Sequence, residues 1–314
     1  MKPNILLLEP IHLDAINELK NFANVDLNYS KIKNQYLKLI NKYEIIIIKS
    51  GILIDQEFIH NSRKLKILCR AGSGLDNISL ELLKKNNIEL VHANKLNSRS
   101  SAEFVVGLII GLTKNIFTAI QNTKSDVFNR EDLLGREIRN LTIGIIGIGS
   151  VGLIVSELLR PFKCRVLGFD INLKNKNLFT KNRGLFCKNV ETVLKKSDVI
   201  SLHMSLNKST QGFFDEDKFK MLKKNCFFIN TSRAKVIDDV ALTNAIKEKR
   251  IQTACLDVID PEPKYTLKKQ HPNKFSKIKN IYLTPHLAAM TDDCQRQIGN
   301  YISKRIINFI KKNY

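Results

Sequence analysis

With 314 residues, 43% of them hydrophobic, the chain is long enough for about two domains, and no apolar run reaches the ~18 residues of a membrane-spanning helix. The N-terminal apolar run is too short for a signal peptide, so we expect a cytoplasmic protein with no membrane partner. The net charge of +21 comes mainly from dispersed lysines without interleaved aromatic residues, which argues against a nucleic-acid partner but allows the steering of anionic substrates.

Apolar and helical patterns alternate through the first hundred residues. The apolar runs predict strands at 5–8, 44–48, 65–69 and 88–91, and the unbroken isoleucine run at 45–48 is typical of a parallel strand buried on both faces. Helical patterns cover 11–22 and 76–85, and a glycine turn, RAGSG at 70–74, follows one of the strands. We expect this region to form an α/β unit of about five strands.

The stretch 101–117 is apolar and contains small residues, so it predicts one long helix, either an intrachain core helix or an interface helix. Further strands are predicted from 141 and at 165–169, 199–202, 226–230, 253–257 and 281–283, with helical patterns between them. Such alternation is typical of a parallel, doubly wound sheet. The last stretch, 291–314, has an amphipathic and basic helical pattern.

A glycine fingerprint opens the second region. The run LTIGIIGIGSVG at 141–152 places Gly147, Gly149 and Gly152 between a predicted strand and a predicted helix. The first glycine allows a tight turn, the second a close approach of the backbone to a pyrophosphate, and the third close packing of the helix on the sheet. Because a helix N-terminus also favours a bound anion, the pattern predicts a dinucleotide site.

An acidic residue stands where such a site needs one. Asp170 lies 18 residues past Gly152, at the end of the next predicted strand, which suits a carboxylate that binds a ribose 2′-hydroxyl. That carboxylate would repel a 2′-phosphate, so the sequence favours NAD over NADP, although Lys174 and Lys176 leave NADP open. The structural alternative is a glycine turn in a sheet that binds nothing, with an incidental aspartate.

Three polar residues follow later strands, near the edge of the sheet where ligands bind in open α/β folds: Arg233, Glu262 and His286. Each also has an ordinary structural interpretation, since the arginine can bind a backbone carbonyl, the glutamate stands between two prolines, and the histidine lies in a loop. The six cysteines show no CxxC and no Cys/His pair at metal spacing, so we expect reduced, buried thiols and no metal site.

Together with further motifs, these residues resemble the D-isomer-specific 2-hydroxyacid dehydrogenase family. The matching segments run in the family's order from about residue 45 to 290: RAGSGLDN at 70–77, NSRSSAE at 97–103, the fingerprint, SLHMSL at 201–206, NTSRA at 230–234, DVIDPEP at 257–263 and TPHLAA at 284–289. The resemblance implies two Rossmann-like or flavodoxin-like α/β domains. An NAD-binding domain, 101–289, is inserted into a substrate-binding domain, 1–100 and 290–314.

The resemblance also implies how the polar residues act. His286 would exchange a proton with the substrate's C2 oxygen, Glu262 would hydrogen-bond its imidazole, and Arg233 would hold the substrate carboxylate and the C2 oxygen. The cofactor is expected to contact Gly147, Gly149, Ser150, Val151, Gly152, Asp170, His203, Thr231 and Asp257, the last at the nicotinamide carboxamide. The substrate is expected to contact Lys49, Arg70, Ser73, Gly74 and Arg99, together with Arg233 and His286.

Two departures from the family pattern concern small residues. Ala234 stands after the arginine, and two alanines, 288 and 289, follow soon after the histidine, where the family often has glycine. These changes put the local backbone geometry in question rather than the chemistry.

The implied activity is hydride transfer between a small 2-hydroxy or 2-oxo acid and NAD, and the motifs at 70–77 and 97–103 favour D-3-phosphoglycerate, the substrate of the first step of serine biosynthesis. Cations at Arg70 and Arg99 suit a phosphate, unless they make structural ion pairs. The alternatives are glyoxylate or hydroxypyruvate reductase, D-lactate dehydrogenase, and an NAD-sensing, corepressor-like scaffold. Only 28 residues follow His286, so we expect the short form without a C-terminal serine-sensing domain, and the family implies a homodimer.

Overall fold

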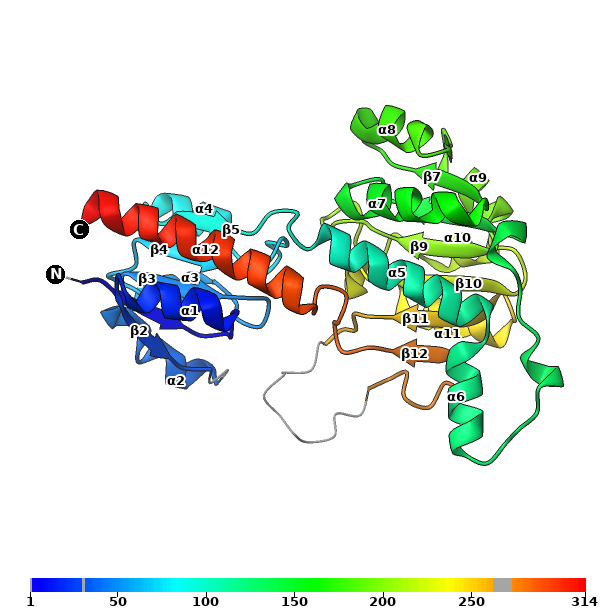
Figure 1. Ribbon diagram of the computed structural model, residues 1–314, viewed down its shortest axis with the longest axis horizontal. Coiled ribbons are helices and arrows are strands. Elements are labelled where there is room, and N and C mark those ends of the chain that lie inside the picture. Colours follow the sequence, from blue (N-terminus) through cyan, green and yellow to red (C-terminus); the bar gives the residue numbers. More distant parts are fainter. Residues whose placement is uncertain (1, 30–31, 262–272) are drawn as a thin grey trace. The chain divides into compact units, whose positions relative to one another are not determined.

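The computed structural model describes residues 2–29, 32–261 and 273–314, which divide into two compact units (Figure 1). The first unit holds the described residues up to Asn97 and again from Ala289 onward, and the second holds those from Ser98 to Ala288. We call them the five-stranded unit and the seven-stranded unit after their sheets.

Every strand pair of the five-stranded unit is parallel, and the strand order is β2-β1-β3-β4-β5. Its strands are β1 (Asn4–Leu7), β2 (Asn24–Leu27), β3 (Ile45–Ile48), β4 (Ile67–Arg70) and β5 (Glu89–His92). Its helices are α1 (Leu13–Lys20), α2 (Lys33–Leu37), α3 (Gln56–Asn61), α4 (Leu80–Lys85) and α12 (Asp292–Asn313), with a 3-10 turn at Ile40–Lys42. The four strands located from the sequence are present. β2 was missed because three of its four residues are exposed and leave no apolar run.

Apolar side chains cover both faces of this sheet. All four residues of β3 are fully buried, as its isoleucine run predicts. On one face α1 and α12 pack together, and their apolar residues share a core with β1 and β3. On the other face, residues of α2, α3 and α4 form a second core, among them Leu37, Phe58 and Leu83. The last helix therefore belongs to the unit that begins with β1.

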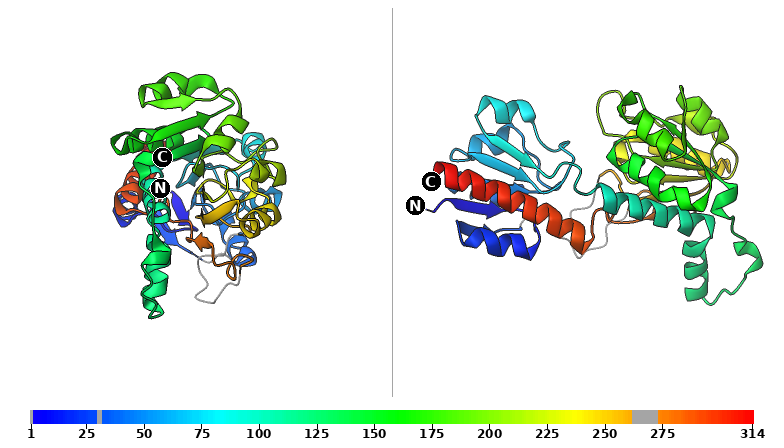
Figure 2. Two further views of the ribbon diagram at one scale, coloured as in Figure 1. Left: turned by 90° about the vertical axis from the view of Figure 1, so that its right-hand side faces the viewer. Right: turned by 45° about the horizontal axis from the view of Figure 1, so that its top comes forward.

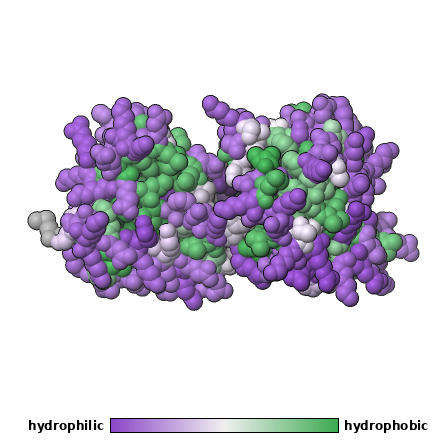
Figure 3. All heavy atoms as spheres, turned by 90° about the horizontal axis from the view of Figure 1, so that it is seen from above, coloured by the Kyte–Doolittle hydropathy of each residue, from purple (hydrophilic) through white to green (hydrophobic). Residues whose placement is uncertain are grey.

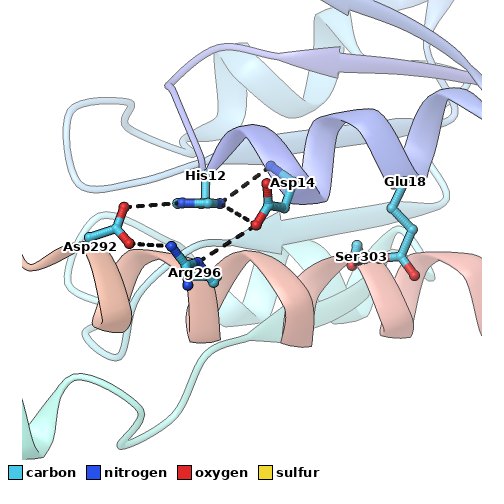
Figure 4. A network of polar contacts seen from close by, with 6 residues as sticks. All are labelled: His12, Asp14, Glu18, Asp292, Arg296 and Ser303. Carbon is cyan, nitrogen blue, oxygen red and sulfur yellow. Dashed lines mark hydrogen bonds and ion pairs between the residues drawn. The ribbon is translucent and has the colours of Figure 1, made fainter.

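Polar contacts add to the packing of α1 on α12 (Figure 4). His12, the N-cap of α1, accepts the Asp14 N–H at its Nδ1 and lies 3.2 Å from Asp292 Oδ1 by its Nε2. Arg296 pairs with Asp292, and its Nε lies 3.6 Å from Asp14 Oδ2. These exposed charges join two helices that are nearly 280 residues apart in sequence.

The seven-stranded unit is also parallel throughout, in the order β12-β11-β10-β9-β6-β7-β8. Its strands are β6 (Thr142–Ile146), β7 (Arg165–Phe169), β8 (Gly184–Phe186), β9 (Val199–Leu202), β10 (Cys226–Asn230), β11 (Ile251–Leu256) and β12 (Ile281–Leu283). Its helices are α5 (Ser98–Thr113), α6 (Ile116–Lys124), α7 (Ser150–Leu159), α8 (Lys176–Lys181), α9 (Val190–Lys196), α10 (Glu216–Lys220) and α11 (Asp239–Lys247). Short 3-10 segments lie at Glu131–Leu133, Ile138–Asn140, Arg160–Phe162, Leu173–Asn175 and Ala234–Val236.

The predicted strands 165–169, 199–202, 226–230 and 281–283 are confirmed at these bounds. Apolar residues again cover both faces of the sheet, with α5 and α7 packed together over one core and α9, α10 and α11 contributing to the other. The doubly wound, parallel α/β architecture is therefore confirmed for both units. The strand order also reverses between β6 and β9, which marks the switch point of the larger sheet.

Two predicted helices differ by more than two residues at one end or both from their bounds in the structure. The helix expected over 101–117 ends at Thr113, because Asn115 has a left-handed backbone with φ of 53°, and α6 continues at 64° to α5 (Figure 2). The helix expected over 76–85 begins only at Leu80. Ser79 is its N-cap and accepts the Leu82 N–H with its Oγ, which sets the start of the helix.

Hydrophilic residues cover much of the face shown in Figure 3, with hydrophobic patches on both units. Among the described residues, no single helix is long and apolar enough to cross a membrane. α5 and α6 together meet that test of length and composition, but only as a bent pair.

The cysteines are all free thiols. Cys69, Cys187, Cys226, Cys255 and Cys294 are buried, and burial raises the pKa of the Cys226 and Cys255 thiols to about 12. They are therefore protonated and unreactive at neutral pH. In the part of the chain that the structure describes, no group of three His, Cys, Asp or Glu side chains is placed to hold a metal ion.

Candidate active site

One row of paired residues crosses six strands of the larger sheet at their carboxyl ends. In sheet order the row consists of Phe169, Ile146, Leu202, Asn230, Leu256 and Leu283. The residues that follow them along the chain are Asp170, Gly147, His203, Thr231, Asp257 and Thr284. Five of these six are predicted cofactor contacts, so the register brings them to one edge, beside the switch point where ligands bind in open α/β sheets.

The glycine loop after β6 has the close contacts that require glycine. Gly147 has a φ of +94°, and a Cβ there would lie 2.7 Å from the carbonyl oxygen of His203. A Cβ on Gly152 would lie 2.2 Å from the carbonyl oxygen of Gly147, so α7 packs directly on the turn. A Cβ on Gly149 would meet nothing within 4 Å. The loop is therefore tightly packed on the protein side and open at Gly149.

Ser150 and Val151 form the first turn of α7, and the N-cap, Gly149, provides no side-chain hydrogen bond to it. The first N–H groups of a helix have no partner within the helix, and they carry the positive end of its dipole. An open glycine next to such a helix start is the cradle that a pyrophosphate fits. The residues present thus suit the phosphates of a dinucleotide.

Asp170 is tied to this loop. Its Oδ2 accepts the Ile148 N–H at 2.6 Å, and its Oδ1 accepts the Asn172 N–H at 2.7 Å. Asn175 donates from its side-chain amide to the carbonyl oxygen of Ile148, at 2.7 Å. We use the name Ile148 clamp for Asp170 and Asn175 together with Ile148, whose backbone N–H and carbonyl oxygen they bond. The clamp holds Asp170, which is predicted to bind a ribose 2′-hydroxyl, next to the glycine loop, which is predicted to bind a pyrophosphate.

The two lysines that left NADP open lie just beyond this carboxylate. Lys174 is in the 3-10 segment that precedes α8, and Lys176 is the first residue of α8. The Lys176 Nζ lies 5.8 Å from the ring centroid of Phe186, a cation–π distance. That lysine thus has an interaction of its own on β8.

The imidazole of His203 contacts β9, the strand that His203 follows. Its Nε2 lies 2.9 Å from Ser201 Oγ, and desolvation by burial lowers the pKa of His203 to about 4. The side chain is therefore neutral at pH 7, while the backbone of the same residue forms the wall against which Gly147 turns. Thr231 is partly exposed at the same edge, one residue past β10.

Arg233 lies in a turn that Asn230 holds. Asn230 is fully buried at the end of β10, and its Oδ1 accepts the N–H of Ser232 at 3.0 Å and the hydroxyl of Ser232 at 2.7 Å. Its amide donates to the carbonyl oxygen of Arg233 at 2.9 Å. The Arg233 guanidinium donates to the carbonyl oxygen of Ser232 at 2.8 Å. The backbone of the arginine is thus set by a side chain three residues earlier.

Asp257 shapes the turn that carries His286. Asp257 is fully buried, and its carboxylate accepts from Thr284 Oγ1 at 2.6 Å, Leu287 N at 2.7 Å and Ala288 N at 2.9 Å. The His286 N–H donates to the carbonyl oxygen of Asp257 at 3.0 Å, and the histidine has a φ of 57°. The carboxylate that the sequence assigns to a nicotinamide carboxamide therefore already has three protein donors.

The alanines that replace family glycines fit their places. Ala234, Ala288 and Ala289 are absent from the described residues that have positive φ, so a Cβ causes no backbone strain there. The backbone at these three positions therefore accommodates alanine in place of glycine. Glu262, the third residue of the predicted catalytic set, lies outside the described residues.

The predicted substrate residues before the fingerprint belong mainly to the five-stranded unit. Lys49 follows β3, and its N–H donates to Glu9 Oε2 at 2.5 Å, while its carbonyl oxygen accepts from the Asn77 amide at 3.0 Å. Glu9 is 2% exposed and also accepts the Gly51 N–H. We call Glu9 and Asn77 acting on Lys49 the Lys49 clamp. The Lys49 ammonium donates to Gln295 of α12 at 2.7 Å.

Arg70, Ser73 and Gly74 lie at the end of β4 and in the loop after it. Arg70 is buried, and its guanidinium folds over that loop, since a Cβ on Gly72 would lie 1.9 Å from its Nη1. The Ser73 hydroxyl contacts Asn97 Oδ1 at 2.6 Å and the Ala93 carbonyl oxygen at 3.0 Å. The hydroxyl thus helps to hold the loop, so the predicted substrate contacts of Ser73 and Gly74 would come from their backbone N–H groups.

Unlike Lys49, Arg70, Ser73 and Gly74, Arg99 belongs to the seven-stranded unit. It lies in the first turn of α5 and pairs through Nε with Glu103 at 2.6 Å and through Nη1 with Glu157 at 3.7 Å. The structural ion pair, which the sequence left as an alternative, is present. Because the two glutamates already pair with the guanidinium, the case for a phosphate contact at Arg99 is weaker.

Four polar residues that support these loops were missed from the sequence: Glu9, Asn77, Asn175 and Asn230. Each lies within a few residues of a strand end or helix start, which is a weak signal because such positions commonly carry polar residues. What identifies them is a hydrogen bond to the backbone of a loop. For all but Asn230, that loop is more than twenty residues away.

Comparison with known proteins identifies the larger unit. The family model described as D-isomer specific 2-hydroxyacid dehydrogenase, NAD binding domain, matches residues 106–288. A D-3-phosphoglycerate dehydrogenase of Archaeoglobus fulgidus is 31% identical over 308 residues, which are 98% of this chain and 57% of that protein. A glyoxylate reductase of Thermofilum pendens is 30% identical over 262 residues, 82% of this chain and 76% of that enzyme.

One solved structure is similar in fold to this chain over nearly its whole length. The D-lactate dehydrogenase of Aquifex aeolicus, crystallised with NAD and lactic acid, is 27% identical and covers 99% of this chain and 96% of its own, with a TM-score of 0.86. The chain spans little more than half the length of its relatives named D-3-phosphoglycerate dehydrogenase, 57% of the Archaeoglobus fulgidus protein and 56% of the Methanocaldococcus jannaschii one.

Proposed function

The chain belongs to the D-isomer specific 2-hydroxyacid dehydrogenase family, whose NAD-binding domain it contains, and we propose that it is an NAD-dependent oxidoreductase acting on the CH–OH group of D-2-hydroxyacids. One observation carries the proposal. The glycine loop, Asp170 and the turns with Arg233 and His286 follow β6, β7, β10 and β12, and all lie at the carboxyl edge of one sheet. Among these acids we propose D-3-phosphoglycerate as the substrate.

In the direction of reduction, Arg233 would bind the carboxylate of the 2-oxo acid and polarise its C2 carbonyl, because a guanidinium presents several donors in one plane. His286 would donate a proton to the C2 oxygen, and in oxidation it would accept that proton, since an imidazole exchanges protons near neutral pH. The nicotinamide, when bound, supplies or accepts the hydride. The turns held by Asn230 and Asp257 would keep both side chains in place.

The five-stranded unit would bind the rest of the substrate. Lys49 and Arg70 offer cations, and the N–H groups of Ser73 and Gly74 offer donors for a carboxylate or phosphate oxygen. The relatives named D-3-phosphoglycerate dehydrogenase support this substrate. We accordingly propose a place in serine biosynthesis.

A substrate panel with matched variants tests the proposal. We expect 3-phosphoglycerate with NAD to be turned over. His286→Ala should lower kcat/KM by about 10²-fold or more while NADH still binds, because acid–base catalysis is lost. His60→Ala, at an exposed histidine of α3, is the control and should behave as wild type. Turnover that survives in His286→Ala would contradict the mechanism. No turnover of any 2-hydroxy or 2-oxo acid would favour the corepressor-like scaffold.

Glyoxylate or hydroxypyruvate reduction is the second candidate, on two observations. Arg99 pairs with Glu103 and Glu157, which weakens the case for one of the cations expected for a phosphate. The chain also spans 76% of the glyoxylate reductase of Thermofilum pendens, more than of the phosphoglycerate dehydrogenases. Turnover of glyoxylate or hydroxypyruvate with NADH, and none of 3-phosphoglycerate with NAD, would establish this candidate instead.

We also propose that the enzyme is a homodimer, formed through the α6 region. α6 has no buried residue and projects from its unit (Figure 2). Ile120 is 51% exposed, and in the segment after α6 Phe128 is 77% and Leu134 87% exposed. Large apolar side chains that are exposed along one segment are typical of an interface. Light scattering should find a dimer that Phe128→Asp combined with Leu134→Asp converts to monomer, and a monomeric wild type would contradict the proposal.

A further inference from the structure

The segment after β7 sends two side chains back to one residue of the glycine loop. Asp170 accepts the Ile148 N–H, and Asn175 donates to the Ile148 carbonyl oxygen, at 2.6 Å and 2.7 Å. Both backbone hydrogen-bonding groups of Ile148 are thus held by side chains 22 and 27 residues further along the chain. The Ile148 side chain is 1% exposed and lies in the core under α7, so the residue is held from three directions.

Asn175 has an unusual position for this contact. It is the N-cap residue of α8, where an asparagine side chain ordinarily accepts an N–H of the helix that it starts. Here the side chain makes no such capping bond, and its amide bonds Ile148 instead. The 3-10 segment that runs into α8 is capped instead by Asn172, whose Oδ1 accepts the Lys174 N–H at 2.9 Å, and the Asn175 amide bonds the loop.

The loop that it bonds has little rigidity of its own. Ile148 stands between Gly147 and Gly149, and glycines lose more conformational freedom on ordering than any other residue. The direction of the N–H groups at the start of α7 depends on how this turn is held. A restraint on Ile148 therefore acts on the whole of the proposed pyrophosphate cradle.

We propose that Asn175 is a positioning residue of the dinucleotide site. With Asp170 it fixes the Ile148 peptides, and this couples the carboxylate that reads the ribose to the loop that receives the pyrophosphate. The inference rests on the proposed use of residues 147–152 for NAD. It assigns to Asn175 a role in cofactor affinity although its amide points to the protein backbone.

The competing interpretation is that Asn175 only fastens α8 to its unit. The chain offers a matched control for this, because Asn182 lies at the other end of α8. Its amide donates to the Leu153 carbonyl oxygen at 3.3 Å and lies 3.2 Å from Ser156 Oγ, both on α7 and beyond the glycine loop. Loss of either amide weakens the attachment of α8, but only loss of Asn175 frees the loop.

The experiment measures NADH dissociation constants by fluorescence titration of the full chain. Asn175→Ala should weaken NADH binding about fivefold, the effect of one hydrogen bond, while Asn182→Ala stays within about twofold of wild type. Asn175→Asp should weaken it at least as much, because a carboxylate oxygen would then face the Ile148 carbonyl oxygen. In steady-state kinetics the loss should be seen in the KM for NADH rather than in kcat.

Hydrogen exchange of the peptide that contains 146–150 gives a readout that needs neither cofactor nor activity. Exchange there should be faster in Asn175→Ala than in wild type and unchanged in Asn182→Ala. If Asn175→Ala does not fold, Asn175→Ser takes its place with the same expectations.

Three outcomes overturn the proposal: unchanged exchange in Asn175→Ala, faster exchange with unchanged NADH affinity, or equal loss of affinity in both variants. If wild type binds no NADH, the proposed function fails and this proposal with it. The exchange data alone would then show whether the Ile148 clamp holds the loop.

Discussion

The Lys49 clamp and the Ile148 clamp use the same chemistry in two different sheets. Each combines a carboxylate that accepts a backbone N–H with an asparagine amide that donates to the carbonyl oxygen of the same residue. In both cases the clamped residue lies just beyond the carboxyl end of a strand. The Lys49 clamp holds a loop that presents a cationic side chain, whereas the Ile148 clamp holds a loop between two glycines.

The carboxylates of the two clamps differ in burial. Glu9 of the Lys49 clamp is 2% exposed, whereas Asp170 of the Ile148 clamp is partly exposed. The Ile148 clamp lies beside the backbone of His203. Burial keeps the imidazole of His203 neutral. A loop at the end of a parallel strand therefore takes its geometry from polar side chains elsewhere in the unit, while its own residues decide whether it presents a charged side chain or only backbone N–H groups.

The largest expected effect tests the neutral histidine of the seven-stranded unit. His203 has a folded-state pKa of about 4 against about 6.5 when unfolded. Above pH 6.5 neither state is charged. As the pH falls from 6.5 to 4, His203 becomes protonated in the unfolded chain but stays mainly neutral in the folded unit. The free energy of unfolding should therefore fall by about 3 kcal/mol. Denaturant unfolding at pH 7, 5 and 4 measures this.

Two variants identify the source of that loss. His203→Asn should flatten the dependence between pH 6.5 and 4, whatever its effect at pH 7, because the group that titrates is gone. His60→Asn, at an exposed histidine of the five-stranded unit, should retain it. An unchanged slope in His203→Asn would show that other groups cause the acid sensitivity.

The next effect breaks the Lys49 clamp. Glu9→Ala should cost about 2 kcal/mol of stability, because the N–H groups of Lys49 and Gly51 lose a buried acceptor. NADH affinity should not change, since the variant lies in the other unit. Glu57→Ala removes an exposed carboxylate that pairs with Lys33 and should cost much less. Equal costs for the two variants in urea unfolding would mean that the Glu9 contacts contribute nothing special.

A smaller effect separates the two clamped loops by function. Asn77→Ala removes the hydrogen bonds to the carbonyl oxygens of Lys49 and Ile52, and it should raise the KM for the 2-oxo acid at least about fivefold with NADH affinity unchanged. Asn175→Ala, by contrast, is expected to weaken the binding of NADH. Steady-state kinetics together with NADH titration checks both variants. If Asn77→Ala weakens NADH binding as Asn175→Ala does, the two loops do not act separately.

The smallest effect concerns the charges between α1 and α12 (Figure 4). Arg296→Ala should lower stability by less than about 1 kcal/mol, because its pairs with Asp292 and Asp14 are exposed. The loss should shrink in high salt, which screens exposed pairs. Thermal unfolding at low and high salt measures it. A loss that persists in salt would point to packing of the arginine stem instead.

The sequence alone determined much of the seven-stranded unit. Strands such as 199–202 and 226–230 are mainly apolar in sequence, because parallel strands are buried on both faces. The fingerprint glycines could be recognised for a similar reason. Backbone contacts that admit no Cβ restrict the residue type at 147 and 152 directly.

Only the tertiary structure decided which polar residues act together. The register alone sets Asp170, Gly147 and His203 side by side, and the left-handed turn at Asn115 ends a helix that the apolar pattern would have continued. Asn77 and Asn175 reach loops 28 and 27 residues away. A hydrogen bond between one side chain and a distant backbone group leaves no periodicity in the sequence, so the clamps become visible only when the chain is folded.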